Sequence, residues 1–367
     1  MKVKIGELTK IKTGKLDANA ASEDGQYPFF TCSKEPLKIS TYSYDCECVL
    51  VAGNGDLNVK YYNGKFDAYQ RTYIIEDNGS GKLYMPYLYY FMEGYIEELR
   101  KQAIGGVIKY IKLGNLTDAL IELPSVEEQK EIVEILKTTK GILDKRSDEI
   151  GSLDDFIKAR FVEMFGNPVL NDKGWEQRFL GEITTKIGSG ATPKGGKEAY
   201  QEEGISLIRS MNVHNGQFEY KDLAHISEEQ AAKLDNVTIE ENDVLLNITG
   251  ASVARSCVVP SEILPARVNQ HVCIIRCKAC IIPEFLNKLL IDDNYQDLLW
   301  NIAESGATRE AITKQQVEDL QIIMPSIELQ KEFMEFCKQV DKSKVAVQKA
   351  LDEAQLLFDS LMQEYFG

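Results

Sequence analysis

The feature that most constrains this chain is a long stretch of sequence that occurs twice. Residues 124–166 and 325–367 align without a gap at a constant offset of 201 positions, and 11 of the 43 aligned residues are identical. Each copy opens on Pro-Ser, with Ser125 or Ser326 in the position of a helix N-cap, and Glu128 completes a capping box in the first copy. Each copy closes on Phe-Gly, and a glycine readily adopts the left-handed conformation that ends a helix. We therefore predict that both copies are long helices.

The two predicted helices carry a row of apolar residues suited to pairing. In the second copy these residues are spaced three and four apart, as in the seam of a coiled coil, whereas Arg146 and Arg160 interrupt the row in the first copy. About 40 residues at about 1.5 Å per residue make a rod of roughly 60 Å, and a lone rod with one apolar stripe is unstable in water. Two unrelated amphipathic helices would not share an offset and end signals, so we predict that the copies pair with each other. The predicted pairing residues are Ile150, Leu153, Ile157, Met164, Val347, Leu351, Ala354, Phe358, Leu361 and Tyr365.

The repeat divides the chain into two globular segments, 1–123 and 167–324, each followed by a long helix, 124–166 or 325–367. Both globular segments are predicted to contain short strands, turns and some helix, and their features follow in the same order. In each, an apolar strand ends in a loop of small residues, VLVAGNGDLN in the first and VLLNITGAS in the second. We therefore predict a mixed α/β protein in which one unit, a globular segment followed by a long helix, occurs twice.

Cellular location and redox state are inferred from what the sequence lacks. The start, MKVKIGELTK, has no apolar run suited to a signal peptide, and no stretch of 18 apolar residues is present. We expect a cytosolic protein. The eight scattered cysteines are then expected to be reduced thiols and not a disulfide framework.

Negative charge is concentrated in the second globular segment. Segment 167–324 has 15 basic against 23 acidic residues, segment 1–123 has 15 against 16, and the two repeats have 7 against 10 and 5 against 8. The whole chain has a net charge of −15. A chain this acidic repels phosphate at long range, so we expect it to bind nucleic acid weakly alone, or together with basic partners.

Motifs for common enzyme classes are incomplete. The segment GSGATPKGGK resembles a phosphate-binding loop, but no frame supplies both its glycines and its lysine. GNGD at 53–56 is better explained as a turn than as part of an adenosylmethionine site, because no amino-methyltransferase motif accompanies it. Cys273, Cys277 and Cys280, with His271 upstream, have a spacing that can hold a metal or a cluster, but Cys273 lies in an apolar run typical of a strand. Buried strand cysteines are the favoured interpretation. We predict no catalytic residue and no metal in this chain.

Taken together, the helix openings LPSVEEQKEI and MPSIELQKEF, the closings MFG and YFG, and the segments YPFFTCS, LVAGNGDLNVKYYNGKFDAYQRTYI and GATREAI resemble the specificity (S) subunit of type I restriction-modification systems. The resemblance covers the whole chain. It implies a non-catalytic subunit whose two target recognition domains each read one half of a split double-stranded DNA sequence. It also implies that the helices pair antiparallel as a ruler, and that two methyltransferase subunits and the restriction subunits are partners. S-adenosylmethionine and ATP would belong to those partners.

The residues expected to contact DNA have polar side chains and lie on loops, from which they can reach the bases. Arg, Lys, Asn and Gln read base edges through paired hydrogen bonds. They fall at corresponding places in the two globular segments, although each one has the alternative role of a solvated surface residue or a turn former. The predicted DNA-binding residues are Ser33, Lys34, Asn54, Asn58, Lys60, Tyr69, Gln70 and Arg71 in the first segment, and Arg209, Ser210, Asn212, Thr249, Arg255, Asn269, Gln270 and Arg309 in the second.

Two other functions remain open at this level. The chain could be an enzyme, either a stand-alone adenine methyltransferase or a metal-cluster protein, in which case it should bind adenosylmethionine or metal. It could also be a structural scaffold that holds other proteins through its rods and never touches DNA.

Overall fold

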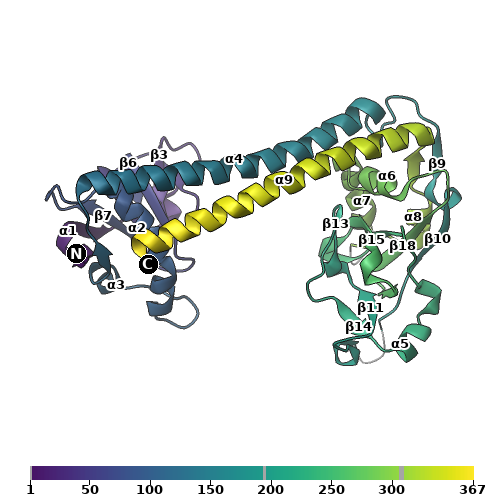
Figure 1. Ribbon diagram of the computed structural model, residues 1–367, viewed down its shortest axis with the longest axis horizontal. Helices are drawn as coiled ribbons and strands as arrows, with labels where there is room; N and C mark the ends of the chain where they lie inside the picture. Colours follow the sequence, from purple (N-terminus) through teal and green to yellow (C-terminus); the bar gives the residue numbers. More distant parts are fainter. Residues whose placement is uncertain (1, 193–195, 306–309) are drawn as a thin grey trace. The chain divides into compact units, whose positions relative to one another are not determined.

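The computed structural model describes residues 2–192, 196–305 and 310–367 (Figure 1). The chain divides into two compact units, of which unit 1 comprises Met1–Glu149 with Val347–Gly367 and unit 2 comprises Ile150–Ala346. Each unit therefore contains one globular segment together with part of each long helix. Of the helices that the structure describes, none combines the length and the apolar character that a membrane span requires.

The globular part of unit 1 is built from strands with three helices. The helices are α1 (Ile5–Leu8), α2 (Met85–Gln102) and α3 (Leu113–Thr117), with a 3-10 turn η1 (Ala18–Ala20). The strands are β1 (Lys2–Lys4), β2 (Thr9–Thr13), β3 (Tyr27–Phe30), β4 (Leu37–Ile39), β5 (Tyr44–Ala52), β6 (Val59–Ala68), β7 (Thr72–Asp77) and β8 (Leu120–Glu122).

Six of these strands form one sheet in the order β2-β7-β5-β6-β3-β4, and β1 pairs separately with β8. Strand β5 is central because its run of apolar residues is buried on both faces, as expected when side chains alternate along a strand. Val49 and Val51 pack in the cluster that contains α2. Cys48 and Leu50 pack in the cluster on the opposite face. The sheet thus has α2 on one side and a smaller apolar core on the other.

Unit 2 has more and shorter elements. Its helices, apart from the long ones, are α5 (Glu228–Ala232), α6 (Pro283–Leu290), α7 (Asp293–Glu304) and α8 (Lys314–Glu318). Its 3-10 turns are η2 (Leu180–Glu182), η3 (Gly196–Ala199), η4 (Ser210–Asn212), η5 (Asp235–Val237), η6 (Gly250–Ser252) and η7 (Ser261–Ile263). Its strands are β9 (Gln177–Phe179), β10 (Thr184–Ser189), β11 (Ile205–Ile208), β12 (Val213–His214), β13 (Gln217–Phe218), β14 (Ala224–Ile226), β15 (Val244–Asn247), β16 (Ser256–Val258), β17 (Ala266–Val268), β18 (Val272–Cys277) and β19 (Gln321–Ile323).

The strands of unit 2 repeat the topology of unit 1. One sheet has the order β10-β18-β15-β16 and another the order β14-β11-β17, with β11 and β17 parallel as β3 and β6 are. The long strand β6 of unit 1 thus corresponds to two shorter strands, β16 and β17, separated by the turn η7. In the same way, the antiparallel pair β9 and β19 corresponds to β1 and β8. The common strand order confirms the internal repeat.

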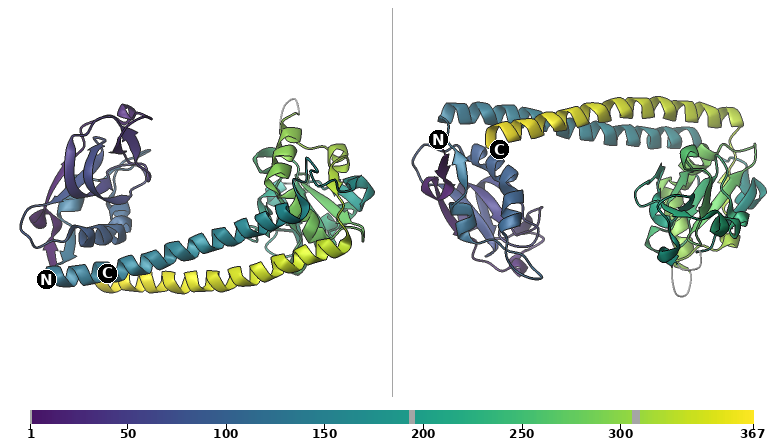
Figure 2. Two further views of the ribbon diagram at one scale, coloured as in Figure 1. Left: turned by 90° about the horizontal axis from the view of Figure 1, so that it is seen from above. Right: turned by 60° about the horizontal axis from the view of Figure 1, so that its bottom comes forward.

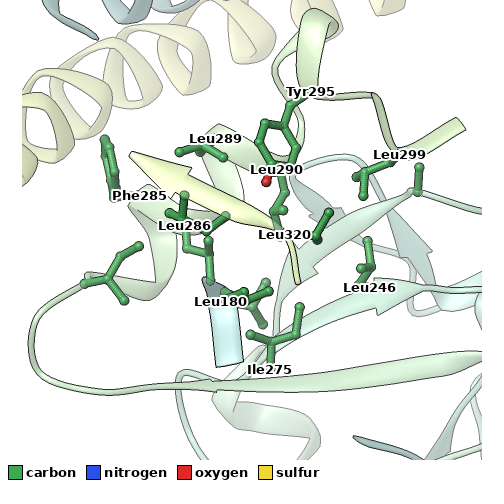
Figure 3. Packing of buried hydrophobic residues seen from close by; sticks show 14 of the residues in the cluster. Leu180, Leu246, Ile275, Phe285, Leu286, Leu289, Leu290, Tyr295, Leu299 and Leu320 are labelled. Carbon is green, nitrogen blue, oxygen red and sulfur yellow. The ribbon is translucent and has the colours of Figure 1, made fainter. Parts of the chain in front are cut away.

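The main core of unit 2 lies between its larger sheet and helices α6 and α7 (Figure 3). Leu246 of β15 and Ile275 of β18 face Leu286 of α6 and Leu299 of α7. Tyr295 is fully buried there, and its hydroxyl donates a hydrogen bond of 2.9 Å to the carbonyl of Gln321.

The long helices are α4 (Val126–Phe165) and α9 (Ile327–Phe366), each shared by both units (Figure 1). In unit 2 the contacts between them run antiparallel, because Asp154 pairs with Lys344 at 2.6 Å whereas Arg160, further along α4, pairs with Glu332, earlier in α9. Figure 2 shows the two helices side by side in two further views. The mixed α/β fold with antiparallel long helices is therefore confirmed.

Several deeply buried residues of α4 and α9 were not among the predicted pairing residues. In unit 2, Phe161, Phe165 and Phe333 pack ring against ring beneath the helices, with centroids 5.2 to 5.5 Å apart. In unit 1, Val133 and Leu136 of α4 enter the core beside α2. These residues anchor each pair of helix segments to its globule.

The predicted pairing residues themselves are buried or half-buried. Ile157, with Leu153 and Met164 beside it, belongs to the core of unit 2. In unit 1, Phe358, Leu361 and Tyr365 pack against the core beside α2. The remaining four are Ile150, Val347, Leu351 and Ala354, of which Val347 is buried and the others half-buried.

Arg160 contributes to the helix pair that the sequence suggested it would interrupt. Its guanidinium bonds to Glu163 at 2.8 Å and to Glu332 of α9 at 3.3 Å, and it lies 5.9 Å from the ring centre of Phe336. Arg146 bonds to Glu149 of its own helix at 2.6 Å. An arginine can lie at the edge of an apolar seam because its stem packs while its charged end reaches acidic neighbours.

The glutamine of the repeated Pro-Ser opening has a structural role in both units. Gln129 and Gln330 are fully buried. The side-chain oxygen of Gln129 accepts from the backbone N–H of Tyr84, the residue before α2, at 2.8 Å, and that of Gln330 accepts from Ile282, before α6, at 2.9 Å. Their amide groups donate to the carbonyls of the repeat prolines at 3.0 and 2.9 Å. Each glutamine thus ties the start of a long helix to the start of a helix in the globule.

Candidate nucleic-acid interface

In unit 1 the predicted DNA-binding residues come together where β3, β5 and β6 meet their loops. The amide of Asn58 donates to the carbonyl of Cys32 at 2.9 Å, and the ammonium of Lys60 donates to the carbonyl of Ser33 at 2.7 Å. The thiol of Cys32 lies 2.9 Å from the side-chain oxygen of Asn54. Lys60 also bonds to Asn58. These bonds hold the loop after β3 against the loop between β5 and β6.

Arg71 lies beside this cluster. Its carbonyl accepts a hydrogen bond of 2.7 Å from the N–H of Gly53, which fixes the turn before β7 next to the loop of Asn54. Its side chain is exposed and makes no ion pair within the described residues. An unpaired guanidinium on a fixed turn is available to a phosphate or a guanine edge.

The other predicted residues of unit 1 are placed differently. Gln70 is exposed, and its amide donates to Asp17, the residue before η1, at 2.7 Å, so this side chain is already engaged within the fold. Tyr69 is half-buried and Lys34 is exposed. Burial lowers the pKa of Lys60, since desolvation disfavours its charged form.

In unit 2 a second cluster forms at the end of β15 and the start of β18. The hydroxyl of Thr249 lies 2.5 Å from Nδ1 of His271, and the amide of Gln270 lies 3.2 Å from Nε2 of the same ring. Gln270 also accepts from the N–H of Thr192 at 2.8 Å. Ser210, Thr249, Arg255 and His271 line one surface hollow of about 530 Å³.

Arg255 is half-buried in the wall of this hollow and makes no ion pair within the part of the chain that the structure describes. Arg209 is less available. It bonds to the carbonyl of Asp222, and its guanidinium lies 5.4 Å from the ring centre of Tyr200.

Two of the predicted contacts in unit 2 are internal. Asn212 is fully buried, and its amide donates to the carbonyls of Glu219 and Lys221 while its oxygen accepts from Arg209. Asn269 is also buried, and its oxygen accepts from the N–H of His271 at 2.9 Å. Both side chains are buried and shape loops, unlike the exposed and half-buried residues of the two clusters. Arg309 lies outside the described residues.

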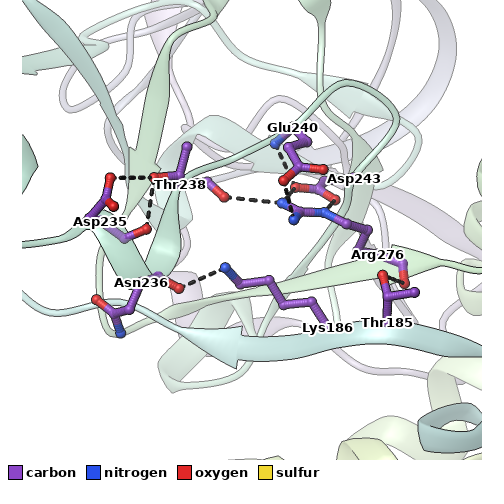
Figure 4. Close-up of polar contacts among 8 residues, drawn as sticks. All are labelled: Thr185, Lys186, Asp235, Asn236, Thr238, Glu240, Asp243 and Arg276. Atoms are coloured by element: carbon purple, nitrogen blue, oxygen red, sulfur yellow. Dashed lines mark hydrogen bonds and ion pairs between the residues drawn. The ribbon is translucent and has the colours of Figure 1, made fainter.

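Two other cations of unit 2, Arg276 and Lys186, are engaged in hydrogen bonds and ion pairs within the fold (Figure 4). Arg276 bonds to both oxygens of the buried Asp243 at 2.8 Å and also contacts Glu240, and these carboxylates raise the pKa of the arginine further. Lys186 donates to the carbonyl of Asn236 at 2.7 Å. Cations tied in this way are unavailable to DNA, which leaves Arg255 as a candidate at the hollow.

The two clusters occupy equivalent places in the repeated topology. In unit 1 the N–H of Gly55 donates to Lys109 and the N–H of Ile111 donates to Gly53, at 3.0 and 2.9 Å. In unit 2 the N–H of Gly250 donates to Glu310 and that of Ile312 donates to Ile248, at 3.0 and 2.8 Å. Asn54 and Thr249 are therefore structurally equivalent, each held between the same two segments of its unit.

Sequence reasoning missed three residues that the structure places at these clusters. Cys32 and His271 each bridge predicted residues. From the sequence, Cys32 was noted only within the segment YPFFTCS and His271 only beside the three cysteines, not as residues that contact DNA. Asn247 is buried, with its amide 2.8 Å from the carbonyl of Ser210 and its oxygen unpaired within the described residues. The sequence did place Asn247 at the end of the apolar strand, and this position could have identified it as a residue of the cluster.

The cysteines that raised the question of a metal do not converge. Cys273 is buried in β18, Cys277 is half-buried at its end, and Cys280 is exposed. Burial raises the pKa of the Cys273 and Cys277 thiols to about 12. Within the described residues no group of three or more His, Cys, Asp or Glu side chains is arranged to hold a metal ion.

Comparison with known proteins gives matches along most of the chain. A family model described as the type I restriction modification DNA specificity domain matches residues 1–150 and 172–354. The specificity subunit of the type I restriction enzyme EcoDI of Escherichia coli is 42% identical over 156 residues, which cover 42% of this chain and only 34% of that protein. That of EcoBI, also from Escherichia coli, is 21% identical and covers 86% of this chain and 71% of that protein. That of MjaVIII from Methanocaldococcus jannaschii is 21% identical, with 95% and 89% covered.

Two solved structures share the fold. The S subunit of a type I restriction-modification system from M. genitalium has a TM-score of 0.61 at 16% identity, with 100% of this chain and 96% of that chain covered. A structure described by the assembly and conformational transition of the type I R-M system has a TM-score of 0.63 at 17% identity, with 100% and 97% covered.

Proposed function

Because the chain belongs to the type I restriction-modification DNA specificity family, we propose that it is the subunit that selects the DNA sequence in such a system. Each globular segment would read one half of a bipartite double-stranded target. The relatives named above are specificity subunits, and they support this function over a stand-alone methyltransferase or a scaffold that never touches DNA.

The observation that carries the proposal is the equivalence of the two clusters. In both units the same strand order brings an exposed or half-buried polar set to the end of the central apolar strand, β5 or β15. The side chains differ, with Asn54, Asn58 and Arg71 in one cluster and Thr249, Arg255 and His271 in the other. Equivalent placement with different chemistry suits two half-sites of different sequence.

The long helices suit the role of a spacer and of a docking surface. We infer that α4 and α9 fix the separation of the half-sites, since each is a continuous helix of 40 residues shared by both units. Both repeats have an excess of acidic residues, which is poor for holding DNA but compatible with docking proteins. The partners would be two methyltransferase subunits, together with restriction subunits where the system includes them.

Catalysis would lie with these partners. In this proposal the chain itself is non-catalytic, and S-adenosylmethionine and ATP are bound by the methyltransferase and restriction subunits. The site of action would be the cytoplasm. Basic surfaces of the partners would supply much of the phosphate neutralisation that a chain of net charge −15 does not.

The test compares two arginine variants in the assembled complex of this chain with its methyltransferase. Arg71→Ala is expected to weaken recognition of one block of the target, and Arg255→Ala that of the other, each by about tenfold, because one base contact is worth about 1–3 kcal/mol. The measurement is specific adenine methylation of duplexes in which each block is varied in turn.

Arg178→Ala provides the control, because Arg178 is exposed and pairs with Glu176 away from both clusters. Circular dichroism of all three variants should match the unmodified protein. Equal loss at both blocks in both variants, or loss of helix content, would show that these arginines stabilise the fold and do not read DNA.

A further inference from the structure

An exposed loop with an apolar tip stands next to the unit 1 cluster. We define it as residues 104–110, IGGVIKY, between α2 and α3. Val107 at its tip is fully exposed, and Ile108 is 61% exposed. Two neighbouring β-branched residues presented to water are unfavourable for an isolated protein, which indicates a surface meant to be covered.

The backbone conformation of the loop is defined by hydrogen bonds and by a glycine. Ile104 and Tyr110 exchange backbone hydrogen bonds of 3.0 and 2.8 Å and close its base. Gly105 has a φ of 120°, and a Cβ at that position would lie 2.5 Å from the carbonyl oxygen of Ile108. Only glycine fits this turn, so the backbone is shaped to present Val107 and Ile108 outward.

The loop is also fixed to the predicted DNA-binding loop. The N–H of Gly55 donates to the carbonyl of Lys109, and Tyr110 forms a β-bridge with Asn54. The apolar tip therefore belongs to the same surface as Asn54, and through Gly53 it is connected to Arg71. Lys109 and Lys112 are exposed on either side of Tyr110 and Ile111. An apolar tip flanked by lysines fits DNA, whose phosphates border a groove that contains apolar groups.

We propose that Val107 and Ile108 contact thymine methyl groups in the major groove of the half-site read by unit 1. This inference rests on the proposed function. The methyl group is the apolar feature that a base pair presents in the major groove, and it distinguishes thymine from cytosine there. Val107 and Ile108 are thus specificity-determining residues, and Lys109 and Lys112 contact the flanking phosphates.

The corresponding sequence of the second repeat differs at these positions. At the offset of 201, Thr308 and Arg309 correspond to Val107 and Ile108. The contact with thymine methyl groups is therefore specific to the first half-site, and the second half-site serves as an internal control.

The test uses the assembled complex of this chain and its methyltransferase on duplexes that carry the bipartite target. The half-site of unit 1 is the block that Arg71→Ala weakens. Thymines in that block are replaced by deoxyuridine, which lacks only the methyl group. Binding by the unmodified protein should weaken about fourfold for each contacted methyl, from about 0.8 kcal/mol per buried carbon. The same replacement in the other block should not change the binding affinity that Val107 and Ile108 contribute.

The variant Val107→Ser with Ile108→Ser should lose this sensitivity to deoxyuridine in the first block. Leu120→Ser is the matched control, because Leu120 of β8 is 52% exposed in the same unit and lies outside the loop; it should retain the full effect. Full sensitivity in the double variant, or none in the unmodified protein, would overturn the proposal. Loss of assembly with the methyltransferase in the double variant alone would overturn it too, by assigning the loop to a protein contact. Failure of the proposed function is distinguishable, because the unmodified complex would then select no sequence.

Discussion

At the scale of single residues, the buried polar side chains decide which parts of the fold are rigid. Gln129 and Gln330 each satisfy a backbone N–H that precedes a helix and a carbonyl that precedes another. A buried donor or acceptor left without a partner costs about 1–3 kcal/mol. The glutamines therefore lock the long helices to the globules more strongly than the exposed ion pairs along α4 and α9.

Gln330→Ala should lower the free energy of unfolding of unit 2 by about 1–3 kcal/mol, because the N–H of Ile282 loses its acceptor. Both tryptophans, Trp175 and Trp300, lie in unit 2, so urea unfolding followed by tryptophan fluorescence reports on this unit. Gln339→Ala, at an exposed position of the same helix, should change stability by less than about 0.5 kcal/mol. Equal effects of the two substitutions would contradict the role of Gln330.

The buried thiols predict how stability responds to alkaline pH. Burial raises the pKa of Cys257 and Cys273 to about 12 and that of Cys337 to about 11. In the unfolded chain these thiols titrate near pH 9, so above that pH the unfolded state has lost protons that the folded state retains. These groups therefore have no effect below about pH 8, and stability falls as pH rises above 9.

The check is the melting temperature between pH 8 and pH 10. Cys273→Ala should lower the melting temperature at pH 8 through loss of packing but make its further fall toward pH 10 less steep. Cys280→Ala, at an exposed thiol, should leave the steepness unchanged. An unchanged slope in the Cys273 variant would show that this thiol does not contribute to the alkaline loss.

At the scale of elements, the parts that the sequence could predict are those specified by local pattern. The long helices follow from caps and periodicity, and the segment α3, β8 and α4 recurs as α8, β19 and α9 at the offset of 201. Tertiary contacts decided the rest. Nothing local indicates that β6 corresponds to two strands in unit 2, and the polar, turn-forming character of Asn212 does not tell whether its amide serves loops or solvent. Phe161, Phe165 and Phe333 were missed because the seam pattern follows the helix partner, whereas these rings face the globule.

The aromatic cluster beneath α4 predicts a large difference between two phenylalanines of that helix. Phe161→Ala should cost about 3–5 kcal/mol, since Phe161 is buried among Phe165, Phe285 and Phe333. Phe156→Ala should cost about 1 kcal/mol, because Phe156 is 54% exposed and packs edge-on with Phe336. Tryptophan fluorescence in urea again provides the measurement. Comparable costs would mean that helix pairing, and not attachment to the globule, stabilises this segment.

At the scale of the whole molecule, the proposed function combines two DNA-reading units with one spacer. The two units share a strand order and present chemically different clusters at equivalent places. α4 begins in unit 1 and ends in unit 2, and α9 does the reverse. In the proposed function, the two helices link the units, so that two separate half-site contacts become recognition of one split sequence.

The measurement that tests this claim most directly is a map of methylated adenines in DNA from cells that express the chain with its methyltransferase. It is made for the unmodified chain and for a variant with seven residues inserted in both helices, after Glu149 and after Ala346. Seven residues add about 10.5 Å and preserve the seam. We predict a motif of two short blocks around a fixed gap, and in the variant the same two blocks with a gap longer by about three base pairs. An undivided motif, or an unchanged gap in the variant, would contradict the account.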